Sequence, residues 1–244
     1  MTPRATLATT ARVLWQLRRD PRTLALVFLV PPLLLTLFKY VFSGQEATFD
    51  RIGGPLVGIF PFISMFLVTS IAMLRERTTG TLERLMTMPL AKLDLLLGYG
   101  LAFALVAAVQ ASLTSLVAFG LLGLDVDGPI WIVIALAVCN ALLGMSLGLF
   151  TSAFARTEFQ AVQFLPAVVF PQVLLCGLLV PRERMADALE WASTVLPLTW
   201  AYDGLRRATV DDVGGEVARD AAIVLAVTVL ALAAGAATLR RRTP

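Results

Sequence analysis

The chain has 244 residues, of which 58% are hydrophobic and 15% are charged, and its formal net charge is +3. A soluble domain carries about a quarter charged residues, so this composition excludes an ordinary soluble protein. The sequence contains no His, which removes His-based catalysis and the commonest metal ligand. Cys139 and Cys176 lie in apolar stretches without the spacing of metal ligands, so we interpret them as small core residues and not as a metal or redox site.

Residues 1–22 have the pattern of a helix that lies in the membrane interface. The apolar side of this helix holds Leu7, Leu14 and Trp15, and its polar side carries three arginines between residues 12 and 19. Basic residues opposite an aromatic side chain suit an interfacial helix. An unstructured leader is the alternative. Pro21 then marks the turn into the membrane.

Six apolar stretches are long enough to cross the hydrocarbon core of a bilayer, which takes about 20 residues. They cover residues 24–42, 53–73, 95–122, 130–150, 159–179 and 220–239. The first is too long for a cleaved signal peptide, contains Pro31 and Pro32, and lacks an A-x-A exit. The sequence therefore predicts an all-α integral membrane protein with six transmembrane helices, forming a single transmembrane domain over residues 1–244.

A polar island, residues 74–94, separates the second span from the third. Thr78 or Thr79 is a suitable N-cap for a short helix, Gly80 permits a sharp turn, and Pro89 would end the helix. The residues between them are apolar on one side and charged on the other (Leu82, Leu85 and Met86 against Glu83 and Arg84). These residues alone also fit an amphipathic loop helix without a special role.

Few polar side chains lie inside the spans, and each has two interpretations. Asn140, Gly144 and Gly148 recur at every fourth residue, which makes a small-residue stripe for close helix contact. The candidates for a substrate path are Gln110, Thr114 and Gln163. Ordinary contact between helices is the alternative for all three.

Prolines and charges inside the spans narrow the possibilities. Pro31 with Pro32 should kink the first transmembrane helix, and Pro166 with Pro171 the fifth. No span has an Asp or Glu in its interior. Because proton and sodium carriers usually place a carboxylate near the midplane, this disfavours an ion-driven secondary transporter. Lys39 lies near the end of its span, where its ammonium group can reach the interface.

Residues 180–219 are the only long connection on the outer side of the membrane. Met185, Leu189, Ala192 and Leu196 are spaced for one helical face, and Pro197 ends that stretch. Aromatic side chains of the kind found at membrane interfaces follow directly. We expect an outer re-entrant helical segment that dips back into the outer leaflet.

The distribution of Lys and Arg predicts the orientation of the chain. Thirteen of the twenty cations fall in residues 1–22, in residues 74–94, at Arg156 and in residues 240–242, and six fall in the other connections. Because cytoplasmic loops carry an excess of Lys and Arg, we expect both termini in the cytoplasm, in a multi-pass protein of the inner (cytoplasmic) membrane. Contact of this basic face with anionic lipid explains the positive net charge, so the charge does not indicate nucleic acid.

The string RERTTGTLERLMTMPLAKLDLLLG over residues 75–98 resembles the cytoplasmic loop of ABC-2 type permeases, the membrane subunits of drug, polysaccharide and lipid exporters. The pattern of that family, E-x-x-x-G-T-L-E-x-L-x-x-x-P, is matched by Glu76, Gly80, Thr81, Leu82, Glu83, Leu85 and Pro89. The run LPLTWAYDGLR over residues 196–206 resembles its second recurrent string. The likeness covers essentially the whole chain and looks closest to the daunorubicin-resistance-type permeases of actinobacteria.

This resemblance implies a role for each part of the chain. The helix in the polar island would be a cytoplasmic coupling helix that docks on an ATPase through the seven matched residues, and residues 1–22 would be the connecting helix. The chain would bind no cofactor, and ATP and Mg²⁺ would bind the partner, since neither Lys39 nor Lys92 lies in a G-x-x-x-x-G-K-[ST] setting. The expected assembly has two ABC ATPase subunits and two permease chains in the bilayer. The second permease chain is most simply another copy in a homodimer, or else a sister permease.

We therefore expect the permease subunit of an ATP-driven ABC exporter that moves a lipophilic or amphipathic solute outward and has no catalytic residues of its own. An ion-gradient-driven secondary transporter is the alternative function. A membrane-embedded enzyme is disfavoured by the absence of His, of paired intramembrane carboxylates and of a G-x-S-x-G motif.

Overall fold

The computed structural model describes residues 3–81, 92–210 and 213–238, which form helices and their connections without any strand. The α-helices are α1 (Pro3–Arg18), α2 (Pro21–Val41), α3 (Glu46–Thr78), α5 (Lys92–Leu116), α6 (Ile130–Thr151), α7 (Glu158–Phe164), α8 (Phe170–Leu175), α9 (Asp187–Val195), α10 (Pro197–Thr209) and α11 (Gly215–Ala237). Two π-helical segments, η1 (Val117–Leu121) and η2 (Leu165–Val169), and a 3-10 helix, η3 (Arg182–Arg184), complete them.

Six helical stretches of the described residues are long and apolar enough to cross a membrane. They are Pro21–Val41, Glu46–Thr78, Leu97–Leu121, Ile130–Thr151, Glu158–Leu175 and Gly215–Ala237. The prediction of an all-helical chain with six spanning helices is therefore confirmed. Several limits differ from the expected ones. The helix α3 begins at Glu46, ahead of residue 53, and continues into the polar island as far as Thr78. The fifth span ends at Leu175, before residue 179, and α11 begins at Gly215, ahead of residue 220.

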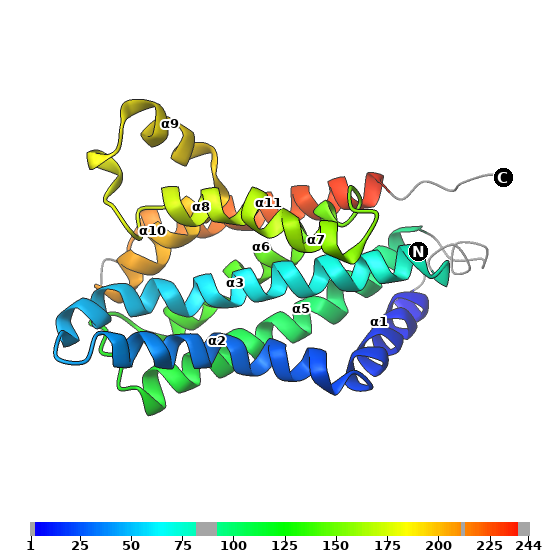
Figure 1. Cartoon of the computed structure of the whole chain (residues 1–244), viewed down its shortest axis with the longest axis horizontal. Helices are drawn as coiled ribbons and strands as arrows, with labels where there is room; N and C mark the ends of the chain where they lie inside the picture. Colours follow the sequence, from blue (N-terminus) through cyan, green and yellow to red (C-terminus); the bar gives the residue numbers. More distant parts are fainter. Residues whose placement is uncertain (1–2, 82–91, 211–212, 239–244) are drawn as a thin grey trace.

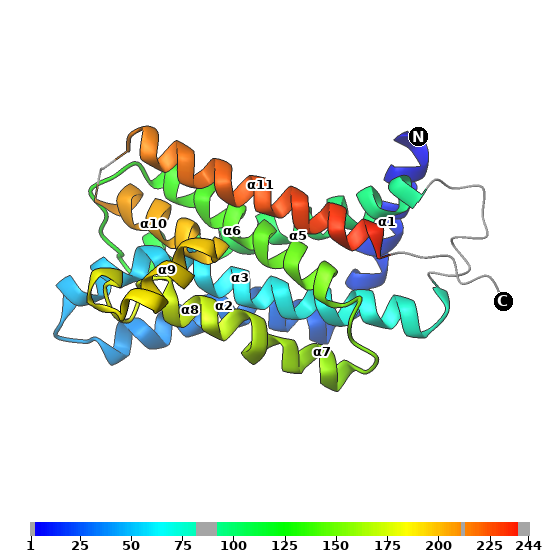
Figure 2. The ribbon, with the colours of Figure 1, turned by 90° about the horizontal axis from the view of Figure 1, so that it is seen from above.

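The spanning helices form an elongated bundle with α3 along its middle (Figure 1). In Figure 1, α2 runs along one side of α3, and α7 with α8 runs along the other. The amino-terminal helix α1 lies across one end of the bundle, and α9 and α10 lie at the other end (Figures 1 and 2). We call the end that holds α1 and the last turn of α3 the island end, and the other the opposite end.

The boundary between α1 and α2 follows local sequence signals. Asp20 caps α2 by accepting a hydrogen bond from the backbone N–H of Thr23 at 3.2 Å, and Pro21 occupies the first helical position. The alternative of an unstructured leader is not what the structure contains, since α1 is a helix that packs on α5. Thr9 lies against Gly98 so closely that a Cβ on this glycine would be 2.5 Å from the Thr9 Cβ. Leu7 and Trp15 are 62% and 55% exposed.

Prolines affect the first and fifth spans differently. The helix α2 runs through Pro31 and Pro32 without interruption. The fifth span is divided at the π-helical segment η2, which contains Pro166, and Pro171 lies in the first turn of α8. A π-helical segment is one of the recognised ways in which a helix accommodates a break in its hydrogen-bond ladder.

The pair of helices α3 and α6 forms the most extensive contact of the bundle. A Cβ on Gly144 would lie 2.2 Å from the carbonyl oxygen of Phe62, and one on Gly148 would lie 2.4 Å from that of Phe66. The hydroxyl of Thr69 donates to the carbonyl of Met145 at 3.1 Å across the same interface. The small residues therefore let the two backbones touch.

The expected re-entrant segment folds into η3, α9 and α10 at the opposite end. The helix α9 ends at Val195, and α10 begins at Pro197, as the proline predicts. Leu198, Ala201, Leu205 and Ala208 of α10 are buried, and α10 packs against α3, α6 and α11. This helix is part of the bundle core at that end.

Candidate functional site

The residues that match the family pattern lie at the end of α3 and just beyond it. Thr78 is the last residue of α3, and Thr79 is its C-cap, so the expectation that one of them is the N-cap of the next helix is wrong. The reason is the position of Gly80. Its φ of +71° turns the chain one residue after the C-cap, so both threonines still belong to the end of α3. Thr81 is again helical. Four predicted coupling residues, Leu82, Glu83, Leu85 and Pro89, fall outside the described residues.

Glu76 joins three helices at the island end. Its Oε1 lies 3.4 Å from Nη1 of Arg12 in α1, and the guanidinium of Arg12 also donates to the hydroxyl of Tyr99 in α5. The guanidinium carbon of Arg12 lies 5.4 Å from the centre of the Tyr99 ring. The Glu76 side chain is only 13% exposed, so its observed partners hold α1 onto the bundle.

The neighbouring arginines of α3 extend this set of contacts. Arg75 forms a two-pronged pair with Glu158 at the start of α7, with Nε and Nη2 donating to the two carboxylate oxygens at 2.6 and 3.1 Å. Its Nη1 lies 3.9 Å from Asp20. Arg77 donates to the hydroxyl of Thr238 at 3.4 Å, just after α11. The last turn of α3 therefore contacts four other segments, and a movement of this turn would be passed to all of them.

A cavity of about 680 Å³ lies between α1, α2, α3 and α5. Its walls are apolar over most of their length, and most of its polar lining residues lie at the island end. These are Gln16, Asp20, Thr23, Arg75, Glu76, Thr79, Thr81 and Tyr99, whereas Ser64 lies near the middle of α3. This volume lies in the range of small-molecule sites, about 300–1,000 Å³. The cavity can therefore hold a drug-sized apolar molecule with one polar end.

Gln110 and Thr114 are buried and are not among the residues that line this cavity. The side-chain amide of Gln110 donates to the carbonyl oxygen of Val27 at 2.7 Å and to the hydroxyl of Ser64 at 2.8 Å. The residue four positions after Val27 is Pro31, which has no N–H to offer this carbonyl. Gln110 therefore supplies the hydrogen bond that the proline removes, as a spanning helix requires. Gln163, the third candidate for a substrate path, is exposed on α7.

Asn140 lies in the stripe with Gly144 and Gly148 and is fully buried in α6. Its Nδ2 would lie 3.1 Å from a Cβ on Gly58 of α3. Neither its Nδ2 nor its Oδ1 has a hydrogen-bond partner among the described residues. The stripe therefore consists of two close backbone contacts and one buried amide.

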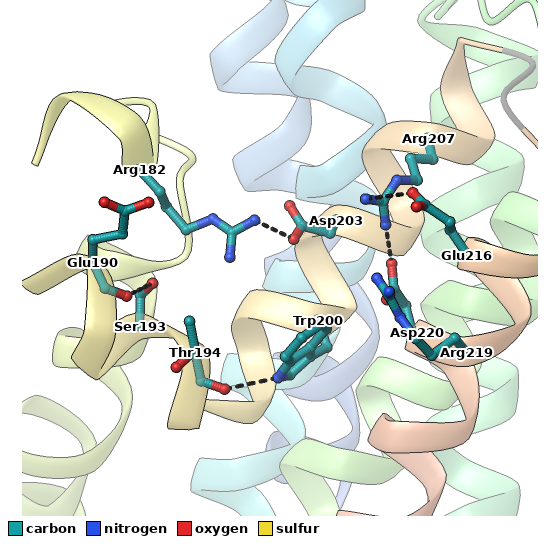
Figure 3. A network of polar contacts seen from close by, with 10 residues as sticks. All are labelled: Arg182, Glu190, Ser193, Thr194, Trp200, Asp203, Arg207, Glu216, Arg219 and Asp220. Carbon is teal, nitrogen blue, oxygen red and sulfur yellow. Dashed lines mark hydrogen bonds and ion pairs between the residues drawn. The ribbon is translucent and has the colours of Figure 1, made fainter.

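A buried ionic network at the opposite end was not anticipated from the sequence. Figure 3 shows Arg182 reaching Asp203 of α10, and Arg207 reaching Asp220 and Glu216 of α11. The Nη2 atoms of Arg182 and Arg207 lie 2.5 Å from Asp203 and 2.8 Å from Glu216. Asp220 is fully buried and also accepts from Arg219 at 3.1 Å.

This network lies at the start of the sixth span. Because α11 begins at Gly215, Asp220, the first residue of the expected sixth span, lies in the second turn of this helix. The position is close to the helix end and not to the middle of the span. Burial raises the pKa of Asp203 above its usual value, against the opposing effect of Arg182. One feature of the sequence could have indicated the network. The connections between spans at the opposite end contain more acidic than basic residues.

Among the described residues, no group of three or more His, Cys, Asp or Glu side chains comes together in a way that could hold a metal ion. Within each end of the bundle, the polar side chains contact one another through ion pairs and hydrogen bonds. The geometry is that of a helical bundle with a cavity.

The profile of the family described as ABC-2 type transporter matches residues 4–209, which is most of the chain. The chain belongs to the ABC-2 type transporter family. Its matched segment runs from α1 to the end of α10 and so contains the polar island, the cavity and part of the ionic network. The chain is accordingly a multi-pass membrane protein.

Relatives of this ABC-2 family member come from bacteria and from an amoeba. It is 28% identical to ABC transporter G family member 20 of Dictyostelium discoideum over 180 residues, which are 73% of this chain and 25% of that protein. It is 28% identical to the inner membrane transport permease YhhJ of Escherichia coli over 149 residues, 60% of this chain and 40% of the relative. With the probable multidrug ABC transporter permease YbhS of E. coli it shares 24% identity over 206 residues, 84% of this chain and 53% of the relative. The matched part spans a quarter to about half of these relatives.

Proposed function

We propose that the chain is the membrane-spanning permease subunit of an ATP-driven ABC exporter and moves a lipophilic or amphipathic solute outward. Membership of the ABC-2 family supports the exporter role, and relatives named as multidrug ABC transporter permeases support the solute class. We further propose, from the motif in residues 75–98, that it groups with the daunorubicin-resistance-type permeases.

The observation that carries this proposal is the cavity between α1, α2, α3 and α5. Its long walls are built from aliphatic and aromatic side chains, among them Leu26, Val30, Ile63 and Phe60. A sugar or a multiply charged metabolite would lose its hydration on such walls without gaining hydrogen bonds. A lipophilic or amphipathic solute would instead gain from the burial of its apolar surface.

The energy for transport would come from two partner ABC ATPase subunits. These subunits would bind ATP and Mg²⁺, and this chain would bind neither. The polar island would receive the movement of the ATPase through Glu76, Gly80, Thr81, Leu82, Glu83, Leu85 and Pro89. The last turn of α3 would pass it on, because Glu76 contacts α1 and Arg75 contacts α7. Two such chains, most simply a homodimer, would form the path in the inner membrane with both termini in the cytoplasm.

The test of the export function is reconstitution of the chain with a candidate ATPase in vesicles, followed with a lipophilic fluorescent compound. We expect flux that requires ATP, stops with a hydrolysis-deficient ATPase, and survives collapse of the proton and sodium gradients. Flux that continues without the ATPase but stops when the gradients collapse would establish the ion-driven alternative instead.

The docking role of the polar island is tested by Leu82→Asp in the same vesicles. A contact that is apolar in the docked state would then contain an unpaired charge, so ATP-driven flux and co-purification of the ATPase should both fall. Membrane insertion should stay normal, and Leu26→Asp on a wall of the cavity would serve as a comparison that leaves co-purification intact. Normal ATPase binding by Leu82→Asp would rule out docking through this residue.

The orientation is tested with single cysteines at two exposed described positions, Thr157 at the island end and Glu183 at the opposite end, after replacement of Cys139 and Cys176. An impermeant thiol reagent added to intact cells should label the cysteine at position 183 and leave that at position 157 unlabelled until the membrane is opened. The reverse pattern would mean that the island end faces outward.

A further inference from the structure

The fifth span is divided near its middle, where η2 separates α7 from α8. Across η2 the backbone departs from the α-helical pattern, because the N–H of Leu165 donates to the carbonyl of Val162 and that of Phe170 to the carbonyl of Leu165. These hydrogen bonds reach back three and five residues, where an α-helix would reach back four. Pro166 and Pro171 have no N–H to add to them. This segment can therefore bend without breaking a regular hydrogen-bond ladder.

The two halves of the span are packed on different neighbours. The helix α7 packs on α3, and α8 packs on α10. On the α7 side, Ala161 belongs to a small apolar cluster with Leu74 of α3 and Ala155. At the end of η2, Val169 belongs to another cluster, which includes Leu198 of α10. One half therefore follows the island end of the bundle, and the other half follows the opposite end.

Gln172 fastens the second half to α10. Its side chain is buried, and its amide oxygen accepts a hydrogen bond from the backbone N–H of Leu198 at 3.4 Å. Leu198 lies in the first turn of α10, where N–H groups have no partner within the helix. Among the described residues, the N-cap Leu196 supplies no side-chain hydrogen bond to this turn. The amide nitrogen of Gln172 also donates to the carbonyl of Val168 in η2 at 3.0 Å, so one side chain joins η2, α8 and α10.

The first half is held by contacts that are easier to rearrange. Of the seven residues of α7, only Ala161 is buried. The pair between Glu158 at the start of α7 and Arg75 of α3 is half exposed on both sides, and exposed pairs contribute little to stability. The helix α7 can therefore change its angle to α8 with little loss of burial.

We propose that η2 is a hinge in the fifth span, at which α7 changes its angle while Gln172 holds α8 on α10. Gln172 is then a positioning residue, which determines that the half at the island end moves and the other half does not. A movement of the last turn of α3 would bend the fifth span at η2 and leave the opposite end in place. The hinge is a property of this chain alone, and only its use in transport rests on the proposed function.

The geometry of the span sets the size of the expected movement. The middle of η2 lies eight residues from Phe159 of α7, which is about 12 Å of helix. A change of about 20° in the kink would therefore displace the backbone at this residue by about 4 Å.

The test measures distances between pairs of spin labels by double electron–electron resonance, on the purified chain in phosphatidylcholine nanodiscs. Cys139 and Cys176 are first replaced by Ala. Labels at Trp131 of α6 and Phe159 span the hinge, whereas labels at Trp131 and Leu174 of α8 do not, and all three positions are exposed. We expect the 131–159 distance distribution to be wider than the 131–174 distribution by about 4 Å. A 131–159 distribution that is no wider would overturn the proposal.

Proline variants locate the hinge. Pro166→Ala returns an N–H to η2, so it should narrow the 131–159 distribution and leave the 131–174 distribution unchanged. Pro31→Ala is the matched control, because it makes the same change in α2, which is helical throughout, and it should change neither distribution. An unchanged 131–159 distribution in Pro166→Ala would contradict a hinge at η2.

Glutamine variants test which half is held. Gln172→Leu keeps a side chain of similar size but loses both hydrogen bonds, so it should widen the 131–174 distribution. Gln163→Leu makes the same change at an exposed position of α7 and should leave this distribution unchanged. Equal 131–174 distributions in Gln172→Leu and the parent protein would remove the positioning role of Gln172.

The nanodiscs contain neither ATPase nor ATP, so the two proposals can fail separately. A wide 131–159 distribution without any ATP-driven flux in the reconstituted vesicles would overturn the exporter function and leave the hinge standing. ATP-driven flux by a chain whose two distributions are equally narrow would do the opposite.

Discussion

Arginine–carboxylate pairs tie both ends of this bundle, but the two ends differ in how much water reaches them. At the island end, the side chains of Arg75 and Glu158 are each 53% exposed. At the opposite end, Asp203 and Asp220 are 6% and 0% exposed. Exposed pairs contribute about 0–1 kcal/mol each, whereas loss of one partner from a buried pair costs about 3–5 kcal/mol.

This difference indicates how the bundle divides mechanically. The opposite end, where α10 and α11 are joined through Arg207 and Asp220, is expensive to rearrange. At the island end, the pair of Arg75 and Glu158 that joins α3 to α7 is exposed and can exchange partners at low cost, whereas the pair of Arg12 and Glu76 that joins α1 to α3 is more buried. Such an asymmetry fits the proposed coupling through the island end, because that end would move while the helices stay assembled.

The largest effect is expected for Asp220→Ala at the opposite end. The variant leaves Arg207 without its buried partner in α11, which should lower the stability by about 3–5 kcal/mol. The measurement is the apparent Tm of the purified protein in detergent, together with the yield of monodisperse protein. Glu216→Ala is the matched control, since Glu216 pairs with the same arginine but is 61% exposed, and it should cost at most about 1 kcal/mol. Equal losses in the two variants would contradict the division into a stiff and a loose end.

The next effect concerns the contact between α3 and α6 that connects the two ends. Gly144→Ala would place a Cβ 2.2 Å from the carbonyl oxygen of Phe62, so the backbones must separate. Such overpacking costs about 1–3 kcal/mol and should lower the apparent Tm and the yield. Gly235→Ala in α11 is the control, because its Cβ would be 3.6 Å from the nearest atom, in ordinary contact. A Gly144→Ala protein as stable as the control would mean that α3 and α6 can separate enough to hold the added methyl group without loss of stability.

The sequence predicted the elements of this fold well because each span is a local signal. A run of apolar residues forms a helix in lipid wherever it occurs, and the stripe of Asn140, Gly144 and Gly148 is visible along a single helix. The stripe lies on the α3–α6 contact, although the sequence did not name α3 as the partner. The turn at Gly80 was also local, but α3 continued to Thr78 because nothing before the glycine ends it.

The polar contacts could not be predicted in the same way, because their partners are distant in the sequence. Arg12 and Glu76 come from α1 and α3, and Arg182 and Asp203 lie on either side of α9. Only the tertiary fold brings them together, and the same holds for Gln110, whose partner is a carbonyl freed by Pro31. The residues that match the family pattern between 82 and 91 lie outside the described part of the chain, so their docking role stays a prediction.

A smaller effect is expected at the island end, for Arg75→Gln. Loss of the exposed pair with Glu158 should lower the stability by at most about 1 kcal/mol. The loss should shrink further when the ionic strength is raised to about 1 M, where the Debye length is about 3 Å. The destabilisation of Asp220→Ala should not respond to salt in this way, because its pair is buried. Apparent Tm values of the wild type and both variants at low and high salt give the answer, and equal salt sensitivity would show that the two ends are alike.

The smallest effect is a pH dependence of opposite sign at the two ends. The pKa of Asp20 is lowered from its usual value of 3.8 by the hydrogen bonds from Thr23, so its contribution is present above that value and is lost as the pH falls through the folded-state pKa. Burial raises the pKa of Asp203 above 3.8, so the folded state takes up this proton first, and the contribution of Asp203 improves as the pH falls from neutral. The difference in apparent Tm between the wild type and Asp20→Asn should therefore hold from pH 7 to about pH 4 and shrink only as the pH falls below that value. The difference between the wild type and Asp203→Asn should change in favour of the wild type as the pH falls from 7 towards about 4. Slopes of the same sign for both variants would mean that burial does not separate the two ends of the bundle.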